Sequence, residues 1–336
     1  MKSYFKLFLV FLAIAICITQ LSCEKEITVD LPTAAPKIVV EGSIEQGQPP
    51  IIFLSWSQGY FEPTDISSIQ DYFIRDAVVK VNDGDEEVTL TEICTSELTE
   101  EQLALISELL GFSPEEMAAY DICAYTSLTM VGEVGKVYSL TVNYEEHHVS
   151  SQTKINNIVQ FDSLWFEVIS ADPTDSLGFV FGIITDPDTA GNAYRWFAKR
   201  ISHYPEWENS LAGEYQQDLA GQPEDFSYIA PNGSVFDDEF FNGLTFEFGY
   251  YRDAILNSYK RDDYDIERGY FKRGDTIAVR GCVIDKGAFD FLSSFEDQQA
   301  SQGSPFSIPF NLKTNIVGGL GGWIGYGAVY DTVICE

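Results

Sequence analysis

The sequence predicts a mainly β protein: an N-terminal immunoglobulin-like or transthyretin-like sandwich with a helical insert, followed by a larger β-rich domain. Two observations predict this class. Apolar residues recur with a period of two in segments such as "VYSLTVNY" at 137–144. The second half of the chain also contains many short segments rich in β-branched and aromatic residues. With 336 residues, 45% of them hydrophobic, the chain can bury cores of this size.

Strands are expected throughout the chain after a short N-terminal segment. The first lies in "KIVVEGSI" at 37–44, and the "NDGD" turn at 82–85 joins the two strands of a hairpin. In the second half, strands are expected at 163–170, 177–185, 193–202, 244–251, 275–285 and 323–336. We place the first β domain at 37–155 and the second at 156–336, because the polar stretch "SSQTKINN" at 150–157 is typical of a strand end and a linker.

Two helical segments interrupt the strands. In the insert at 95–122, Leu103 and Ile106 recur at helical spacing after Thr99, which is placed as an N-cap. A second helix is expected near 287–300, where Phe289 and Leu292 fall on one face.

The N-terminus has the features of a secretory signal peptide at 1–22. Lys2 and Lys6 precede an apolar stretch, and Cys23 follows its end, where lipoprotein signal peptidase would cleave and the cysteine would carry lipid. The preceding "QLS" departs from the usual lipobox, and an ordinary signal peptide followed by an unrelated cysteine is the alternative. A tether at 23–36 would connect the lipid to the first strand.

Four cysteines remain after Cys17 and Cys23 are set aside. An even number in an exported chain suggests disulfides, and three pairings are open. Proximity in the sequence favours Cys94 with Cys123 and Cys282 with Cys335. Closing the helical insert with the first pair would stabilise the fold by about 3 to 4 kcal/mol in the chain-entropy description.

The charge of the chain excludes two classes of partner. Its formal net charge is −32, and removal of the signal peptide makes it more negative. Nucleic acid and anionic lipid headgroups are therefore not expected to bind. The chain also has only three histidines and lacks GxSxG, HExxH and similar motifs, so we do not expect an enzyme.

Two acidic segments are candidates for calcium, the one cofactor considered. Asp186 and Asp188 occupy the first two ligand offsets of a calcium loop, but Phe197 stands where an EF-hand has its terminal glutamate. Asp237 and Asp238 in "FDDEFFNG" form the second candidate. Asp, Asn and Gly are also turn formers, so an ordinary strand connection is the favoured interpretation of the first segment.

Aromatic residues are the candidates for binding a small molecule, a peptide or a glycan. They make up 14% of the chain and are dense in its second half, where they serve either as stacking surfaces or as core. The positions selected are Tyr204, Trp207, Tyr215 and Trp323. Trp323 lies in "GGLGGWIGYG", which lacks the Lys-Ser/Thr of a phosphate loop and indicates tight backbone passage with aromatic anchors.

The ordered set "DLPTAAPKIVVEGSI", "DAVVKVNDG", "VGKVYSLTV", "NAYRW", "DDEFFNG", "RGDTIAVR" and "PFNLKTNIVGGLGGWIGYG" resembles the Bacteroidota outer-membrane lipoproteins grouped as domain of unknown function 4249. The insert at 94–123 is longer than this resemblance implies. The resemblance implies an outer-membrane, surface-facing lipoprotein associated with TonB-dependent transporters, with Glu24 and Glu26 as surface-export signals. It implies no enzymatic activity and no site residue besides Cys23.

We therefore expect a lipid-anchored, non-enzymatic protein that captures a ligand as an accessory to a TonB-dependent transporter. A lipid tether would replace high affinity with high local concentration. An independent surface adhesin or scaffold is the alternative, and a glycan-active enzyme comes third.

Overall fold

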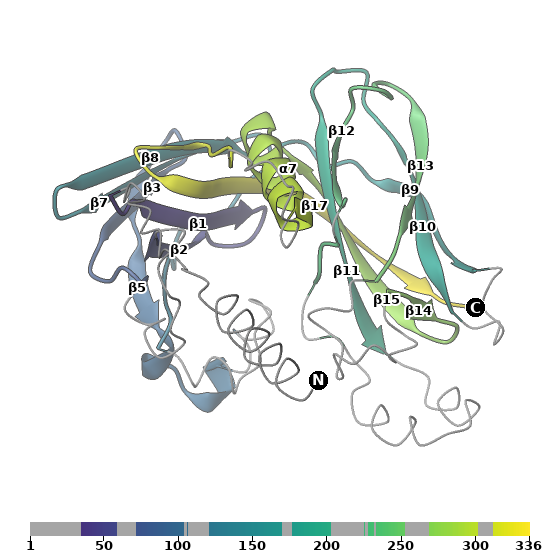
Figure 1. The fold of residues 1–336 in the computed structure, drawn as a ribbon, viewed down its shortest axis with the longest axis horizontal. Coiled ribbons are helices and arrows are strands. Elements are labelled where there is room, and N and C mark those ends of the chain that lie inside the picture. Colours follow the sequence, from purple (N-terminus) through teal and green to yellow (C-terminus); the bar gives the residue numbers. More distant parts are fainter. Residues whose placement is uncertain are drawn as a thin grey trace, which may run out of the picture. The chain divides into compact units, whose positions relative to one another are not determined.

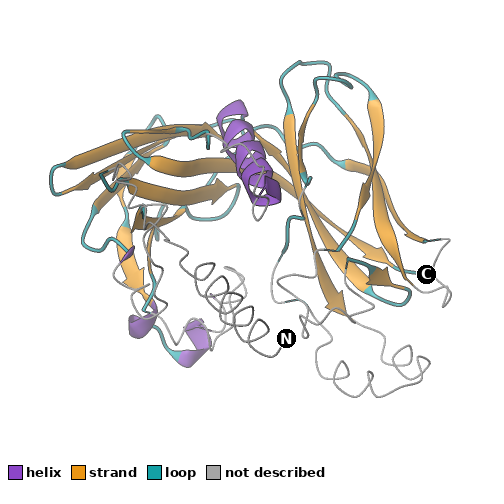
Figure 2. Cartoon of the chain, in the orientation of Figure 1, coloured by secondary structure: helices purple, strands orange, loops and turns teal. Residues whose placement is uncertain are grey.

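The computed structural model describes residues 35–58, 72–103, 106, 121–169, 177–202, 225, 228–231, 233–252, 269–301 and 312–336. By internal contacts the chain divides into Met1–Ala35 and Pro36–Glu336. The predicted signal peptide and Cys23 lie outside the described residues. Within the described ranges, no helix is both long and apolar enough to cross a membrane. The prediction of a mainly β chain is confirmed (Figure 2).

An eight-stranded sheet runs through the whole of the second unit (Figure 1). Its strands, in spatial order, are β12 (Val235–Asp237), β11 (Ala193–Ser202), β15 (Thr276–Ile284), β17 (Leu320–Ile334), β1 (Ile38–Glu45), β2 (Ile51–Trp56), β6 (Cys123–Thr126) and β5 (Thr91–Cys94). The first half of β17 pairs in parallel with β1, and its second half pairs antiparallel with β15. One strand from the C-terminus thus joins the two halves of the sheet.

The glycines of "GGLGGWIGYG" allow β17 to lie close to neighbouring backbone, as the sequence predicted. A Cβ on Gly325 would lie 2.6 Å from the carbonyl oxygen of Lys154, and one on Gly327 would collide with the carbonyl of Asn156. Gly321 has φ +95°, a conformation that side chains rarely adopt. Neighbouring backbone therefore occupies the space that side chains would need.

A five-stranded sheet covers the part of the large sheet that contains β1, β2 and β6. Its strands are β16 (Ile316–Val317), β8 (His147–Lys154), β7 (Val137–Tyr144), β3 (Val78–Asn82) and β4 (Glu87–Thr89). The core between these sheets includes Val40, Leu54 and Tyr138, and it also takes Ile316 and Trp323 from the C-terminal end. The predicted hairpin is present, because β3 and β4 pair antiparallel. In its turn, Asn82 Oδ1 accepts a hydrogen bond from Gly84 N.

A four-stranded sheet covers the part of the large sheet that contains β11 and β15. It contains β9 (Phe161–Val168), β10 (Leu177–Thr185), β13 (Thr245–Tyr250) and β14 (Phe271–Lys272). Its inner face packs against β11, β15 and β17 around Val180, Trp196 and Val279. Helix α7 (Lys286–Ser301) packs Ala288 and Leu292 on the opposite face of the large sheet.

The start of the helical insert is visible after a 3-10 turn, η2 (Thr95–Glu97). Thr99 Oγ1 accepts a hydrogen bond from Gln102 N, and Gln102 Oε1 accepts one from Thr99 N. This reciprocal capping box confirms Thr99 as the N-cap. Residues 104–105 and 107–120 of the insert lie outside the described ranges.

Candidate functional site

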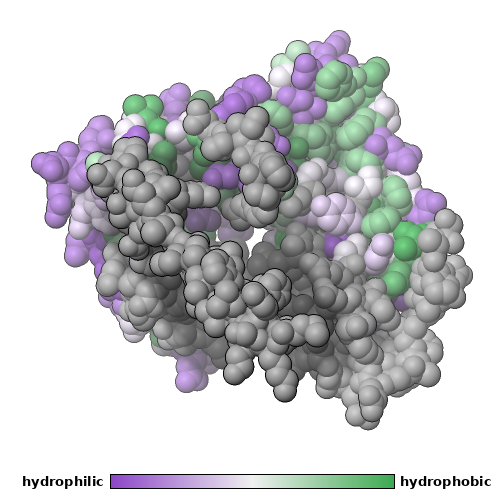
Figure 3. Space-filling view, viewed as in Figure 1, coloured by the Kyte–Doolittle hydropathy of each residue, from purple (hydrophilic) through white to green (hydrophobic). Residues whose placement is uncertain are grey.

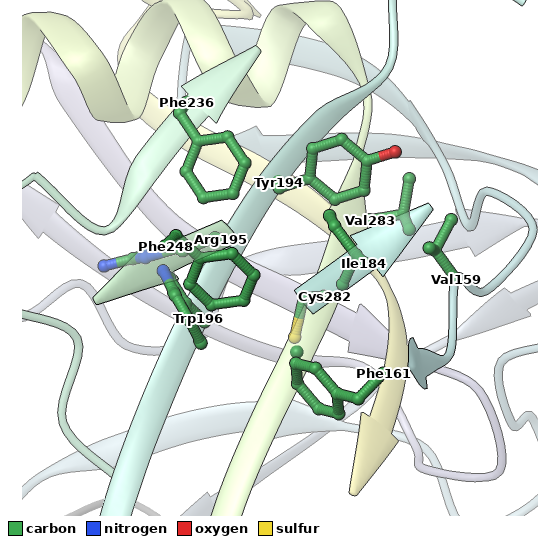
Figure 4. Close-up of a pocket in the computed structure, with 11 residues that line it drawn as sticks. Val159, Phe161, Ile184, Tyr194, Arg195, Trp196, Phe236, Phe248, Cys282 and Val283 are labelled. Carbon is green, nitrogen blue, oxygen red and sulfur yellow. The ribbon is translucent and has the colours of Figure 1, made fainter. Parts of the chain in front are cut away.

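The four-stranded sheet and the part of the large sheet that it covers form the second sandwich of the fold. A cavity lies between these two sheets. The space it encloses is about 20 Å³. Figure 4 shows the aromatic rings of Phe161, Trp196, Phe236 and Phe248 around it, with Ile184 beside them. Five different strands supply these side chains, so the frame of the cavity is set by sheet packing rather than by loops.

The chemistry of the cavity is apolar. Its one hydroxyl belongs to Tyr194, which donates a hydrogen bond to Asp186 Oδ1. Burial raises the pKa of Tyr194, and the adjacent Asp186 carboxylate raises it further. The hydroxyl thus stays protonated and committed to Asp186. The cavity volume of about 20 Å³ is enough for a water molecule, whereas pockets that bind drug-sized molecules span about 300 to 1,000 Å³.

A family model described as "Domain of unknown function (DUF4249)" matches residues 24–331. The chain belongs to the DUF4249 family. The resemblance seen in the sequence is therefore confirmed at the level of the family. A search of curated proteins finds no match.

Two of the predicted calcium ligands of this DUF4249 protein, Asp186 and Asp238, accept hydrogen bonds from neighbouring loops. Asp238 is buried and accepts hydrogen bonds from the backbone N–H groups of Gly191 and Asn192 at 2.9 Å. Asp186 is also buried, and its Oδ2 accepts one from Gly243 N at 2.9 Å. The two carboxylates meet at Asn192, whose side chain reaches Asp186.

These contacts give Asp186 and Asp238 a structural role. The oxygens that a cation would need already accept hydrogen bonds from the loops that they hold together. Asp188 is exposed, and Asp237 Oδ1 accepts a long contact from Glu239 N at 3.4 Å. In the described part of the chain, the sole cluster with metal-ligand spacing is Glu92, Cys94 and Cys123, and its two sulfurs are bonded to each other. The contacts of Asp186 and Asp238 fit the interpretation of the first segment as a strand connection, and calcium binding stays a prediction.

The first predicted disulfide is confirmed. Cys94 on β5 and Cys123 on β6 are direct cross-strand partners and form a disulfide that closes the insert. Glu92 lies beside it, and its Oε2 accepts hydrogen bonds from Asp76 N and the Tyr125 hydroxyl.

The second predicted disulfide is wrong, because Cys282 and Cys335 are both free and buried. Cys282 lies opposite Ala328 on β17, whereas Cys335 follows Ile334, the partner of Thr276. Six residues separate Thr276 from Cys282 along β15, which is roughly 20 Å at about 3.3 Å per residue. A disulfide requires Cα atoms within about 7 Å. The two side chains also lie in different cores, on opposite faces of the sheet.

Trp323 is a core residue, which corrects its selection as a ligand-binding side chain. Its side chain is 0% exposed, and its indole N–H donates to the carbonyl of Tyr138 at 3.0 Å. The alternation of β17 turns this residue inward beside β1. The other three selected aromatics, Tyr204, Trp207 and Tyr215, lie outside the described residues.

The sequence did not reveal a group of charges and rings on the α7 side of the large sheet. The guanidinium carbon of Arg280 lies 4.5 Å from the ring centre of Phe197 and 4.8 Å from that of Tyr326. Arg195 donates to the Tyr326 hydroxyl at 3.1 Å. Arg280 also pairs with Glu45, which is 235 positions away in the sequence. No local pattern could have signalled that contact.

Two of the three histidines, His147 and His148, lie at the start of β8. His148 Nδ1 shares a hydrogen bond with Asn143 Oδ1 at 2.7 Å. The buried Nδ1 of His147 has no hydrogen-bond partner in the described residues, and its ring meets the edge of Trp56. His203 lies outside the described ranges. Burial raises the pKa of Cys282 to about 11, so its thiol is not a ready nucleophile.

Proposed function

We propose that this DUF4249 protein is a lipid-anchored, surface-facing lipoprotein of the outer membrane. Cys23 would carry the lipid, and residues 23–36 would be the tether to the first strand, which begins at Ile38. The disulfide between Cys94 and Cys123 supports export, because such bonds persist in oxidising compartments.

The role we propose is non-enzymatic capture of a ligand for a TonB-dependent transporter. The observation that carries it is the row of aromatic side chains on the outer side of the four-stranded sheet, where Trp165, Phe179 and Phe181 keep part of their surface exposed and offer contact surface to a ligand. The lipid would hold the protein beside its transporter in two dimensions. A modest affinity for the barrel would then be enough.

Co-purification from native outer membrane tests this proposal. The protein carries a tag after Glu336, which is exposed, and is extracted in mild detergent with its partners identified by mass spectrometry. We expect a stoichiometric TonB-dependent barrel with the unsubstituted protein. The Cys23→Ala variant should lose both the lipid and the barrel, whereas the matched Cys17→Ala variant should keep both.

Two results would contradict the proposal. If Cys23→Ala still incorporates fatty acid, the anchor is misplaced. If the anchored protein purifies without a barrel, the accessory role fails, and an adhesin that binds a macromolecule alone becomes the better interpretation.

A further inference from the structure

The outer face of the four-stranded sheet is aromatic. Along β10, Val180 and Ile184 point into the core, while Phe179, Phe181 and Ile183 alternate with them and belong to neither core cluster of this sandwich. Each of these three outer side chains keeps part of its surface exposed. Figure 3 shows hydrophobic residues at the surface in the region where Figure 1 draws β9, β10 and β13.

Two rings on this face have a defined geometry. Phe181 lies over Gly249 of β13, where an added Cβ would meet three of its ring atoms at 2.9, 3.3 and 3.6 Å. Trp165 of β9 stacks beside Phe181, with ring centres 5.7 Å apart and an angle of 18° between the planes. Because Gly249 has no side chain, the Phe181 ring can lie over β13 while it stacks nearly parallel to Trp165 on β9.

A second pair extends the same face. The ring centres of Phe179 and Tyr270 lie 5.3 Å apart at 42°. We call Trp165, Phe179, Phe181 and Tyr270 the outer aromatic face. Such rings present a negative π surface, which attracts the partially positive C–H bonds of a ligand as well as offering apolar contact.

Hydrogen-bonding groups flank the outer aromatic face. Glu167 of β9 is the cross-strand partner of Phe179, and Glu247 of β13 is the partner of Ile183. Both carboxylates are exposed. At the end of β10, the exposed Thr185 hydroxyl donates to Asp162 at 2.7 Å. Acceptors thus border the rings on both neighbouring strands.

The charge of this face selects among ligands. The three bordering carboxylates and a chain charge of −32 disfavour anionic glycans, nucleic acid and anionic membranes. A neutral sugar fits both parts of the surface, because its axial C–H faces suit the rings and its equatorial hydroxyls can donate to carboxylates.

The geometry points to a neutral glycan as the ligand of the outer aromatic face, with sugar rings stacked on Trp165 and Phe181 and hydroxyls bound by Glu167 and Glu247. This inference rests on the proposed ligand-capturing role and names its ligand class. It places recognition on the outer side of the four-stranded sheet, where all four rings are half-buried, rather than in the internal cavity.

Calorimetry with defined oligosaccharides tests the inference on the purified full chain. The neutral probes are cellohexaose, laminarihexaose, maltohexaose and mannohexaose, and the charged probes are hexagalacturonate and pentalysine. We expect at least one neutral probe to bind and to change the fluorescence of Trp165, with no binding of hexagalacturonate. Binding of pentalysine alone, or of no neutral probe, would overturn the inference.

Substitutions locate the site. Trp165→Leu and Phe181→Leu keep an apolar side chain but remove the ring, and each should weaken binding at least tenfold, while Trp165→Phe should retain most of it. Phe295→Leu is the matched control, because Phe295 is exposed on α7, which packs on the other sheet. Equal binding by Trp165→Leu and the control would refute a stacking site, provided that both melt at the wild-type temperature.

The same variants separate this inference from the transporter role. Trp165→Leu should still co-purify with the barrel, since its lipid anchor is unchanged. If the wild-type protein retains the barrel but binds none of the neutral probes, the ligand class is wrong and the accessory role stands. If it binds a neutral probe but recovers no barrel, the glycan site stands and the accessory role is wrong.

Discussion

Arg280 on β15 and Glu45 on β1 form an ion pair across β17, the strand that lies between theirs. Their side chains are 15% and 12% exposed. The Tyr330 hydroxyl donates to the other carboxylate oxygen of Glu45 at 2.5 Å, so both oxygens have partners. β1 contributes to the core under the five-stranded sheet, whereas β15 contributes to the cores under the four-stranded sheet and under α7. The ion pair therefore couples the two parts of the large sheet.

Glu45→Gln should therefore destabilise the protein by about 2 to 4 kcal/mol, because it leaves the mostly buried Arg280 cation without its counter-charge. Glu87→Gln is the matched control. It breaks an exposed pair with Lys80, and we expect a loss below about 0.5 kcal/mol. Urea unfolding of both variants measures the difference. Equal small losses would mean that the Arg280 pair adds nothing beyond a surface contact.

The sequence predicted the local elements well because their causes are local. The alternation in "VYSLTVNY", the turn after Asn82 and the capping box at Thr99 each depend on residues within a few positions of one another. By contrast, the parallel pairing of Val39 with Leu320 joins the two ends of the described chain. Nothing in either segment specifies its partner, and the burial of Trp323 follows from that pairing.

The glycines of β17 yield a second prediction. Gly325→Ala should destabilise the protein by about 1 to 3 kcal/mol, because its Cβ would press on the backbone of Lys154 and Ile155. Gly287→Ala is the control on α7, where a Cβ would have its nearest neighbours at 3.3 Å and alanine favours the helix by about 1 kcal/mol. Thermal melting should lower the transition for Gly325→Ala alone. A similar drop in both would point to a general loss of backbone freedom instead.

The cysteines give a chemical prediction. In the native protein without reductant, Cys282 and Cys335 should resist iodoacetamide at pH 8, because burial raises the pKa of both thiols, that of Cys282 to about 11. After denaturation, both should alkylate fully, while the peptides containing Cys94 and Cys123 remain linked until a dithiol is added. Peptide mass spectrometry reads out each site. A linked peptide containing Cys282 and Cys335 would overturn the strand register described for β15 and β17.

Acid stability should depend on Asp83 in the turn between β3 and β4. The Lys136 ammonium, 2.8 Å from its carboxylate, and the backbone N–H of Glu86 hold the pKa of Asp83 at about 2, below its ordinary 3.8. A carboxyl whose pKa is lowered by folding stabilises the folded state above its unfolded pKa and loses that effect as the pH falls. The contribution is thus complete above about pH 4 and declines towards about pH 2. Between these limits, the free energy of unfolding should fall less steeply for Asp83→Asn than for the wild type. Parallel pH profiles for the two proteins would show that Asp83 has the same pKa in the folded and unfolded chains.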